Sequence, residues 1–376
     1  MNILHVLLHK VLGLVAGFLN VIIAAAVLPA ATSFHYLTIL SASQVFMAFA
    51  GFGISHKLVL LPAEEAQRQR SWPWFLLTFV MGCLFFNYLN KDPTAINLWP
   101  TTFFVSGLFL LIILAEWLRV AVARQIGFII YNITLIIAAS TIFVSKSIPI
   151  WLGILPILGS FLLLWAGRNF YTIYGEHIRP KMEDIYRTFR VASVNQYYNF
   201  IVLLCSLTGL GPESLVVVLI FRFAIFYNWQ NFFWLRFSHK ELSQPIEKKH
   251  RMNNLRFVRV NFLALFGTIA VAILAQIFDL YRYVPSGAFD REFALLLLYF
   301  AALRTVINLI FPYEVFLLYS ANLRTNVLFL IFSSLSLMII AYIMWLSKNP
   351  FTIISCVEIN WIIWRFLSKR IIQNER

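Results

Sequence analysis

The chain has 376 residues, of which 61% are apolar and only 12% are charged. Soluble domains carry roughly 25% charged residues, so this composition excludes a soluble globular protein and indicates an integral membrane protein. The net charge of +14 would suggest nucleic-acid binding in a soluble chain. In a membrane protein it suits basic loops that face anionic lipid, and no nucleic-acid partner is expected.

Twelve apolar stretches are each long enough to cross a bilayer, which takes about 20 residues. In chain order they lie near residues 11–31, 36–61, 72–89, 102–123, 126–144, 149–167, 190–209, 214–235, 260–279, 293–318, 325–346 and 350–366. This pattern predicts an all-α integral membrane protein with about twelve transmembrane helices. The first stretch lacks a clear cleavage site, so we expect it to stay as a signal anchor.

The basic residues between these stretches indicate the orientation of the chain. When the N-terminus is placed in the cytoplasm, most Lys and Arg fall in or beside cytoplasmic loops. The external ones are Lys91, Lys146, Arg282, Arg291 and Lys348. The positive-inside rule therefore predicts that both termini are cytoplasmic.

A polar segment at 169–189 divides the predicted spans into two sets of six. The halves, 1–168 and 190–376, both begin in the cytoplasm, which favours two parallel six-helix bundles around a central cavity. Residues 183–190 within and beside this segment mix acidic, basic and apolar side chains. Either an amphipathic helix on the inner membrane surface or an irregular basic loop would fit them.

Several ionisable residues lie inside predicted spans, where a charge costs at least about 2.5–3.5 kcal/mol. Arg222 and Arg304 have two readings. In the first reading they line an aqueous cavity and bind an anion, and a phosphate or diphosphate is the natural anionic ligand of a guanidinium. In the second reading they neutralise Glu358 or Glu314 in buried ion pairs.

Three carboxylates in predicted spans, Glu358, Glu314 and Glu116, are candidates for ion coupling. Desolvation would favour a neutral Glu358, as a proton-coupling group requires. Arg119 follows Glu116 by one helical turn, so a local ion pair is the favoured reading for Glu116.

Uncharged polar residues gather near the cytoplasmic ends of the seventh and eighth spans. Asn195 and Asn199 flank two tyrosines in the first group, and Asn228 and Asn231 lie at matching depth in the second. Amides and aromatic rings are the groups that bind sugars. The alternative is hydrogen bonding between helices, worth about 0.6 kcal/mol each.

No nucleotide-binding, metalloprotease or serine-hydrolase motif is present, and Cys83, Cys205 and Cys356 are scattered through predicted spans. We therefore expect no cofactor, no metal and no disulfide framework.

Short sequence features near the N-terminus carry a family resemblance. They are the basic start at 9–13, a brief turn at 29–35, and a Phe-Gly-Ile step ending on Lys57 within 49–57. Together these features resemble the opening of Wzx-type polysaccharide flippases of the multidrug/oligosaccharidyl-lipid/polysaccharide superfamily. The restart at 190–192 and the turn at 209–213 are similar to that family's seventh and eighth spans. The chain departs from the family at 30–35, where its usual Gly-x-x-x-[FY]-Gly turn is replaced.

The resemblance implies a transporter that flips an undecaprenyl-diphosphate-linked oligosaccharide, an O-antigen or other surface polysaccharide unit, across the bacterial inner membrane. It implies alternating access driven by an ion gradient, and a polysaccharide polymerase and a chain-length regulator as partners. The family's cationic cavity residues carry over to Arg222 and Lys57, whereas Arg304 has no assigned family position.

The alternative class is a membrane-embedded enzyme, either a sugar O-acyltransferase or a polymerase. Polymerases usually carry a large external loop, and the longest one expected here is 279–292. An acyltransferase needs a positioned histidine as base, but the predicted spans leave the histidines in loops or at span ends, with His35 outside. A third reading is an exporter of small amphiphiles. We therefore expect a transporter and not an enzyme.

Overall fold

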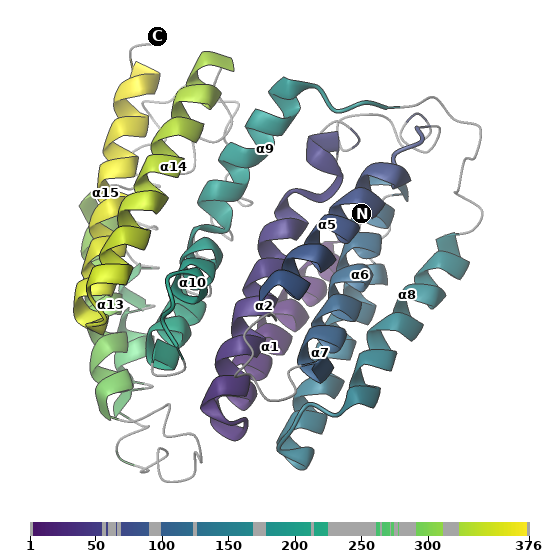
Figure 1. Ribbon diagram of the computed structural model, residues 1–376, viewed down its shortest axis with the longest axis horizontal. Coiled ribbons are helices and arrows are strands. Elements are labelled where there is room, and N and C mark those ends of the chain that lie inside the picture. Colours follow the sequence, from purple (N-terminus) through teal and green to yellow (C-terminus); the bar gives the residue numbers. More distant parts are fainter. Residues whose placement is uncertain are drawn as a thin grey trace. The chain divides into compact units, whose positions relative to one another are not determined.

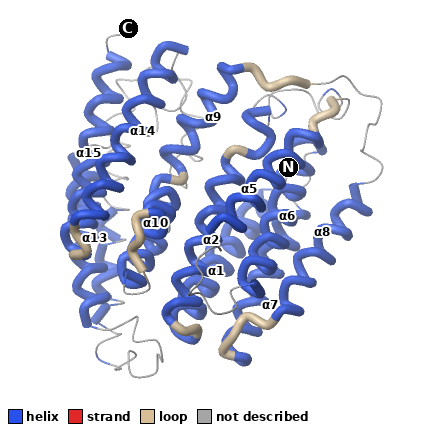
Figure 2. Tube along the Cα trace, viewed as in Figure 1, coloured by secondary structure: helices blue, strands red, loops and turns tan. Residues whose placement is uncertain are grey.

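In the computed structural model, the described residues form helices, and none of them forms a strand element (Figures 1 and 2). The description covers residues 3–54, 58, 65, 69–89, 99–122, 126–167, 178–211, 214–224, 261–263, 265–270, 272–273, 277, 291–310 and 323–373. The chain divides into two compact units, Met1–Leu203 and Leu204–Arg376. The predicted pair of six-helix bundles separated by 169–189 stays a prediction.

Among the described residues, five helices are long and apolar enough to cross a membrane: Ala30–Gly53, Trp72–Leu89, Trp99–Arg119, Ile126–Ser145 and Arg291–Leu309. Shorter apolar helices lie at Val15–Val27, Ile150–Trp165, Tyr197–Leu207, Leu215–Ala224, Asn261–Ala270, Leu330–Leu346 and Pro350–Ile363. Each of these helices overlaps one of the predicted spans. The all-α class is therefore confirmed for the described residues, and their apolar helices fit a membrane protein.

Apolar side chains also cover outward faces of the helices. Leu84, Phe143, Val144 and Phe161 are all more than half exposed. A soluble protein rarely exposes so many large apolar groups together, whereas hydrocarbon is a favourable surrounding for them. These faces are therefore suited to contact lipid.

Unit 1 is built around one buried helix, α6 (Trp99–Val122). The other elements of the unit are α1 (Ile3–Val27), α2 (Ala30–Ala48), the 3-10 helix η1 (Ala50–Gly53), α5 (Trp72–Leu89), α7 (Ile126–Ser145), η2 (Ile150–Gly153), α8 (Ile154–Gly167), α9 (Met182–Asn195) and α10 (Tyr197–Leu207), in which the unit boundary falls. α6 packs against α2, α5, α7 and α8, and α1 packs along α7. Small residues allow the close approach: a Cβ added at Gly127 would lie 2.7 Å from the Ala115 Cα.

The turn predicted at 29–35 is wrong. The connection is only Leu28 and Pro29, because α2 already begins at Ala30. Pro29 has an extended backbone (ψ 144°), and two alanines, the best helix formers, follow it. His35 therefore lies within α2, is 9% exposed, and places Nε2 3.4 Å from the Thr102 Oγ1. The loop position expected for His35 is therefore wrong, because the residue lies within a helix.

The predicted second span is also interrupted, because α2 ends at Ala48 and η1 follows. Gly51, Phe52 and Gly53 have φ angles of 67°, 50° and 88°, a left-handed backbone that costs a residue with a side chain roughly 1–2 kcal/mol. The Gly51 N–H donates to the Thr78 Oγ1 at 3.2 Å. η1 thus redirects the chain where the sequence pattern predicted a continuing helix.

Helix α9 packs directly on η1. A Cβ added at Gly53 would lie 2.6 Å from the Asp184 carbonyl oxygen and 2.7 Å from the Thr188 Oγ1, and the rings of Phe49 and Phe189 lie 5.7 Å apart. Of the two readings of 183–190, a helix is confirmed, and its position on the inner membrane surface stays a prediction. α9 also extends into the predicted seventh span, which is broken at Gln196 (φ −110°, ψ 14°) before α10 begins.

Gly53→Ala should destabilise the protein more than Gly209→Ala does. Both glycines have positive φ, but a Cβ at Gly209 meets nothing within 4 Å, so Gly209→Ala reports backbone strain alone. Gly53→Ala adds overpacking against α9, typically about 1–3 kcal/mol. Thermal denaturation of the intact chain in detergent, followed by circular dichroism, should show a lower melting temperature for Gly53→Ala. Equal losses for the two variants would contradict tight packing of α9 on η1.

The described part of unit 2 contains a helix at Leu215–Ala224, a helical segment from Asn261, and helices α13 (Arg291–Ile310), α14 (Leu323–Leu346) and α15 (Pro350–Gln373). α15 packs against both α13 and α14 (Figure 1, green to yellow). The Asn349 Oδ1 caps the start of α15 by accepting from the Phe351 N–H at 2.9 Å, as short polar side chains do at helix N-termini. Asn360 donates to the Ser336 Oγ at 2.6 Å, which links α15 to α14.

Candidate functional site

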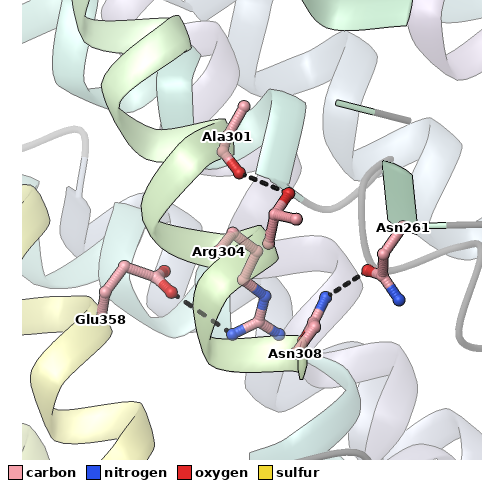
Figure 3. A network of polar contacts seen from close by, with 6 residues as sticks. Asn261, Ala301, Arg304, Asn308 and Glu358 are labelled. Carbon is pink, nitrogen blue, oxygen red and sulfur yellow. Dashed lines mark hydrogen bonds and ion pairs between the residues drawn. The ribbon is translucent and has the colours of Figure 1, made fainter. Parts of the chain in front are cut away.

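A buried ion pair joins α13 and α15 in unit 2. The Arg304 Nη1 lies 3.4 Å from the Glu358 Oε2, and both side chains are 0% exposed (Figure 3). Both residues lie on apolar helices: Leu297, Phe300 and Ala301 precede Arg304 and are buried. The pair therefore sits in a low-dielectric surrounding, where an isolated charge would be very costly. This pairing is one of the two readings that the sequence left open for Arg304.

The indole of Trp361 lies against the same guanidinium. The Arg304 Cζ is 5.1 Å from the Trp361 ring centroid, within the range of a cation–π contact. Trp361 follows Glu358 by three residues, so both side chains lie on one face of α15. We did not select Trp361 from the sequence, although its spacing from Glu358 was a visible signal.

A second polar contact lies one turn further along α13. Asn308 donates to the Asn261 Oδ1 at 2.7 Å, and both residues are fully buried. Figure 3 shows Arg304 and Asn308 on α13, with Glu358 reaching Arg304 from α15 and Asn261 reaching Asn308 from another segment. Because residues four apart share a helix face, Arg304 and Asn308 form one polar strip along α13 that contacts these partners. The Asn pair was also missed at the sequence level.

The ion pair of unit 1 has a different geometry. Arg119 donates to Glu116 from Nε at 2.7 Å and from Nη2 at 2.6 Å, so this predicted local pair is confirmed. The Arg119 side chain is 37% exposed and can retain water. The Arg304–Glu358 contact is both longer and fully dry. Burying two ions costs several kcal/mol each and is offset only when the geometry is excellent, so stability alone explains this pair poorly.

Arg222 lies on the Leu215–Ala224 helix and is 5% exposed. The neighbouring Phe223 places its ring 5.6 Å from the ring of Phe293 at the start of α13. The helix that carries Arg222 therefore contacts the helix that carries Arg304. Glu358, one predicted partner for either arginine, lies against Arg304. Anion binding by Arg222 stays a prediction.

Asn199 is buried in unit 1 and donates to the Gln196 Oε1 at 2.5 Å. Gln196 occupies the break between α9 and α10, and the rings of Tyr197 and Tyr198 lie 5.4 Å apart beside it. The amide contact is thus local to the break, a third arrangement besides sugar binding and a contact between neighbouring helices. Sugar binding by this group stays a prediction.

Other predicted site residues lie outside the described residues: Lys57, Asn228, Asn231 and Glu314. For Asn195, the structure describes only the backbone, as the last residue of α9.

A further buried network in unit 1 links α1, α2 and α7. Asn20 donates to the Leu135 carbonyl oxygen at 2.6 Å, and the Tyr36 hydroxyl donates to the Asn20 Oδ1. Gln44 donates to the Tyr131 hydroxyl at 3.3 Å. These are contacts between neighbouring helices of the kind that polar residues make in membranes, so we assign them to packing.

No protein family model, curated protein or solved structure matches this chain. Among the residues that the structure describes, no group of three or more His, Cys, Asp or Glu is placed to hold a metal ion. The chemistry present in the Arg304 site is that of a guanidinium, a carboxylate, an aromatic face and two amides, which suits binding an anion and a proton.

Proposed function

We propose that this chain is a membrane transporter that moves an undecaprenyl-diphosphate-linked oligosaccharide across the bacterial inner membrane by alternating access. The proposal includes about twelve transmembrane helices and cytoplasmic termini. The observation that carries it is the fully buried Arg304–Glu358 pair between two apolar helices.

A buried ion pair of this kind is better explained by a role in transport than by a role in holding the helices together. Exchanging a buried ion pair for apolar residues of similar volume is often neutral or even stabilising, so packing does not require it. Ionisable groups inside membrane proteins commonly mark substrate or ion pathways. A diphosphate crossing the membrane needs counter-charges along its path, and a guanidinium matches phosphate oxygens in a bidentate way.

The residues then have distinct roles in the proposal. Arg304 and Arg222 would bind the diphosphate, and Glu358 would couple transport to an ion gradient. Lys57 would add positive charge, Glu314 would be a second coupling carboxylate, and the asparagines at 195, 199, 228 and 231 would contact the glycan. Glu116 is better explained by its pair with Arg119.

Reconstitution of the full chain in liposomes tests the proposal. We expect a lipid-linked glycan, placed in one leaflet, to become accessible to a lectin added on the other side when a proton or sodium gradient is imposed. Undecaprenyl monophosphate without a glycan should compete weakly, because it lacks both the diphosphate and the sugar. Glycan exposure no faster than in protein-free liposomes, under both gradients, would contradict the proposal.

A further inference from the structure

We infer that Arg304, Glu358 and Trp361 form an exchange site in which one proton and one anionic group together replace the internal ion pair. Glu358 takes the proton, and Arg304 takes the anion. The inference rests on the proposed transport of a diphosphate-linked substrate and specifies how that transport is coupled to protons.

Charge balance at a dry site dictates the exchange. Glu358 and Arg304 are both 0% exposed, so the carboxylate and guanidinium neutralise each other while the pair is closed. Protonation of Glu358 alone would remove this counterion from the buried Arg304 charge, and breaking a buried ion pair from one side costs about 3–5 kcal/mol. Binding of an anion alone would place it beside the Glu358 carboxylate, which repels it. With one singly charged phosphoryl group at Arg304, the site is neutral again only when the proton and that group bind together.

The long distance between Glu358 and Arg304 makes it easier for an anion to replace the Glu358 carboxylate. Glu358 approaches Arg304 at 3.4 Å, whereas the paired oxygens of Glu116 lie at 2.6 and 2.7 Å from Arg119. Charge-assisted contacts normally measure about 2.7–2.9 Å. The Arg304–Glu358 contact is therefore loose for an ion pair that has been fully desolvated, so less attraction is given up when another anion takes the place of the carboxylate beside Arg304.

Trp361 keeps Arg304 in place during the exchange. Its indole face lies 5.1 Å from the guanidinium carbon, and a cation–π contact of this kind does not depend on the protonation of Glu358. Trp361 and Glu358 are carried by the same face of α15, so one helix supplies both the removable counterion and the lasting support. Trp361 is thus a positioning residue.

Among the described residues, the neighbouring helices bring few other titratable groups to this position, and Tyr299 on α13 shares a hydrogen bond with Ser355 on α15. On α13, Arg291 and Glu292 are exposed at the first turn, away from Arg304. On α14, Tyr342 is 60% exposed. Cys356 lies two residues before Glu358 on α15, and Arg222 lies on the helix that contacts α13 through Phe223. Among these described groups, Glu358 is the buried carboxylate that can exchange its charge at Arg304.

The test measures proton uptake by the full-length wild-type chain in detergent when inorganic pyrophosphate is added in weak buffer. We expect uptake of about one proton per bound pyrophosphate beyond what the probe itself binds, and at least about tenfold tighter binding at pH near 5.5 than near 8. Binding without such uptake would overturn the inference, and this measurement needs no variant that must fold.

Variants then locate the proton and the anion. Glu358→Gln should bind pyrophosphate with only the probe's own pH dependence and no further proton uptake. Adding Arg304→Gln to it should weaken binding at least about tenfold. Trp361→Leu should weaken binding while keeping the proton uptake, and Trp361→Phe should restore much of it. Glu292→Gln, an exposed carboxylate on the same helix as Arg304, is the matched control and should behave as wild type. Unchanged proton uptake in Glu358→Gln would overturn the inference.

These results are separable from the proposed function. Proton-linked pyrophosphate binding in a protein that moves no lipid-linked glycan would support the exchange site and reject the proposed substrate. Glycan transport with no proton-linked binding of pyrophosphate would support the function and overturn the exchange site.

Discussion

Replacing Glu358 by leucine should lower the free energy of unfolding by about 3–5 kcal/mol, because it leaves the Arg304 guanidinium buried without its counterion. Further replacement of Arg304 by methionine should restore most of that stability, since Met has a similar length and carries no charge. Both native side chains are 0% exposed, so water cannot reach the unpaired charge unless the helices separate. Thermal denaturation in detergent, followed by circular dichroism, would compare the single and double variants.

Glu116→Leu is the matched control for this experiment. It removes the carboxylate of the other ion pair, but the Arg119 side chain is 37% exposed and can reach water. Glu116 is buried (8% exposed), but Arg119 stays partly exposed, so the loss should be smaller than for Glu358→Leu. A double variant at Arg304 and Glu358 as unstable as Glu358→Leu would show that the buried charge is not the cause of the loss.

The same double variant separates stability from transport. It should be folded but inactive, because both the anion-binding group and the coupling carboxylate are absent. Recovery of transport together with stability would assign the pair to packing alone and remove the main support for the proposed function.

Arg222→Ala should reduce transport of the lipid-linked glycan at least about tenfold while membrane insertion stays normal. A hydrogen bond to a charged group contributes about 1.5–3 kcal/mol, and each 1.36 kcal/mol is a factor of about ten in rate. Removal of an intramembrane charge also eases insertion, so a defect in transport would not come from misassembly. Arg222→Lys keeps the charge but loses the planar fork and should retain part of the activity.

The double variant Arg222→Ala, Glu358→Ala tests the opposite reading, in which Arg222 only neutralises a carboxylate. Glu358 lies against Arg304, so we expect the double variant to stay inactive. Recovered transport in liposomes would make Arg222 a structural counterion and exclude it from the anion path.

Hydropathy and residue spacing predicted the structure correctly where the interactions that decide it lie within one helix. The start of α5 at Trp72, its end at Leu89, and the bounds of α7 at Ile126–Ser145 agree with the predicted spans to within a residue. The Glu116–Arg119 pair followed from its spacing of three along one helix. The same rules failed at 29–35 and at η1, where Pro29 and the packing of α9 on Gly53 decided the backbone.

The sequence by itself determined that this is an all-α membrane protein, because apolar length and charge spacing respond to the bilayer and not to a particular packing partner. It also marked Arg304 and Glu358 as the costly residues. Only the tertiary structure decided that these two side chains meet, since they lie 54 positions apart and Glu314 was an equally valid partner by composition. The Trp361 support and the Asn308–Asn261 contact depend on the same packing of α13 against its neighbours, and no spacing rule within one helix could have paired them.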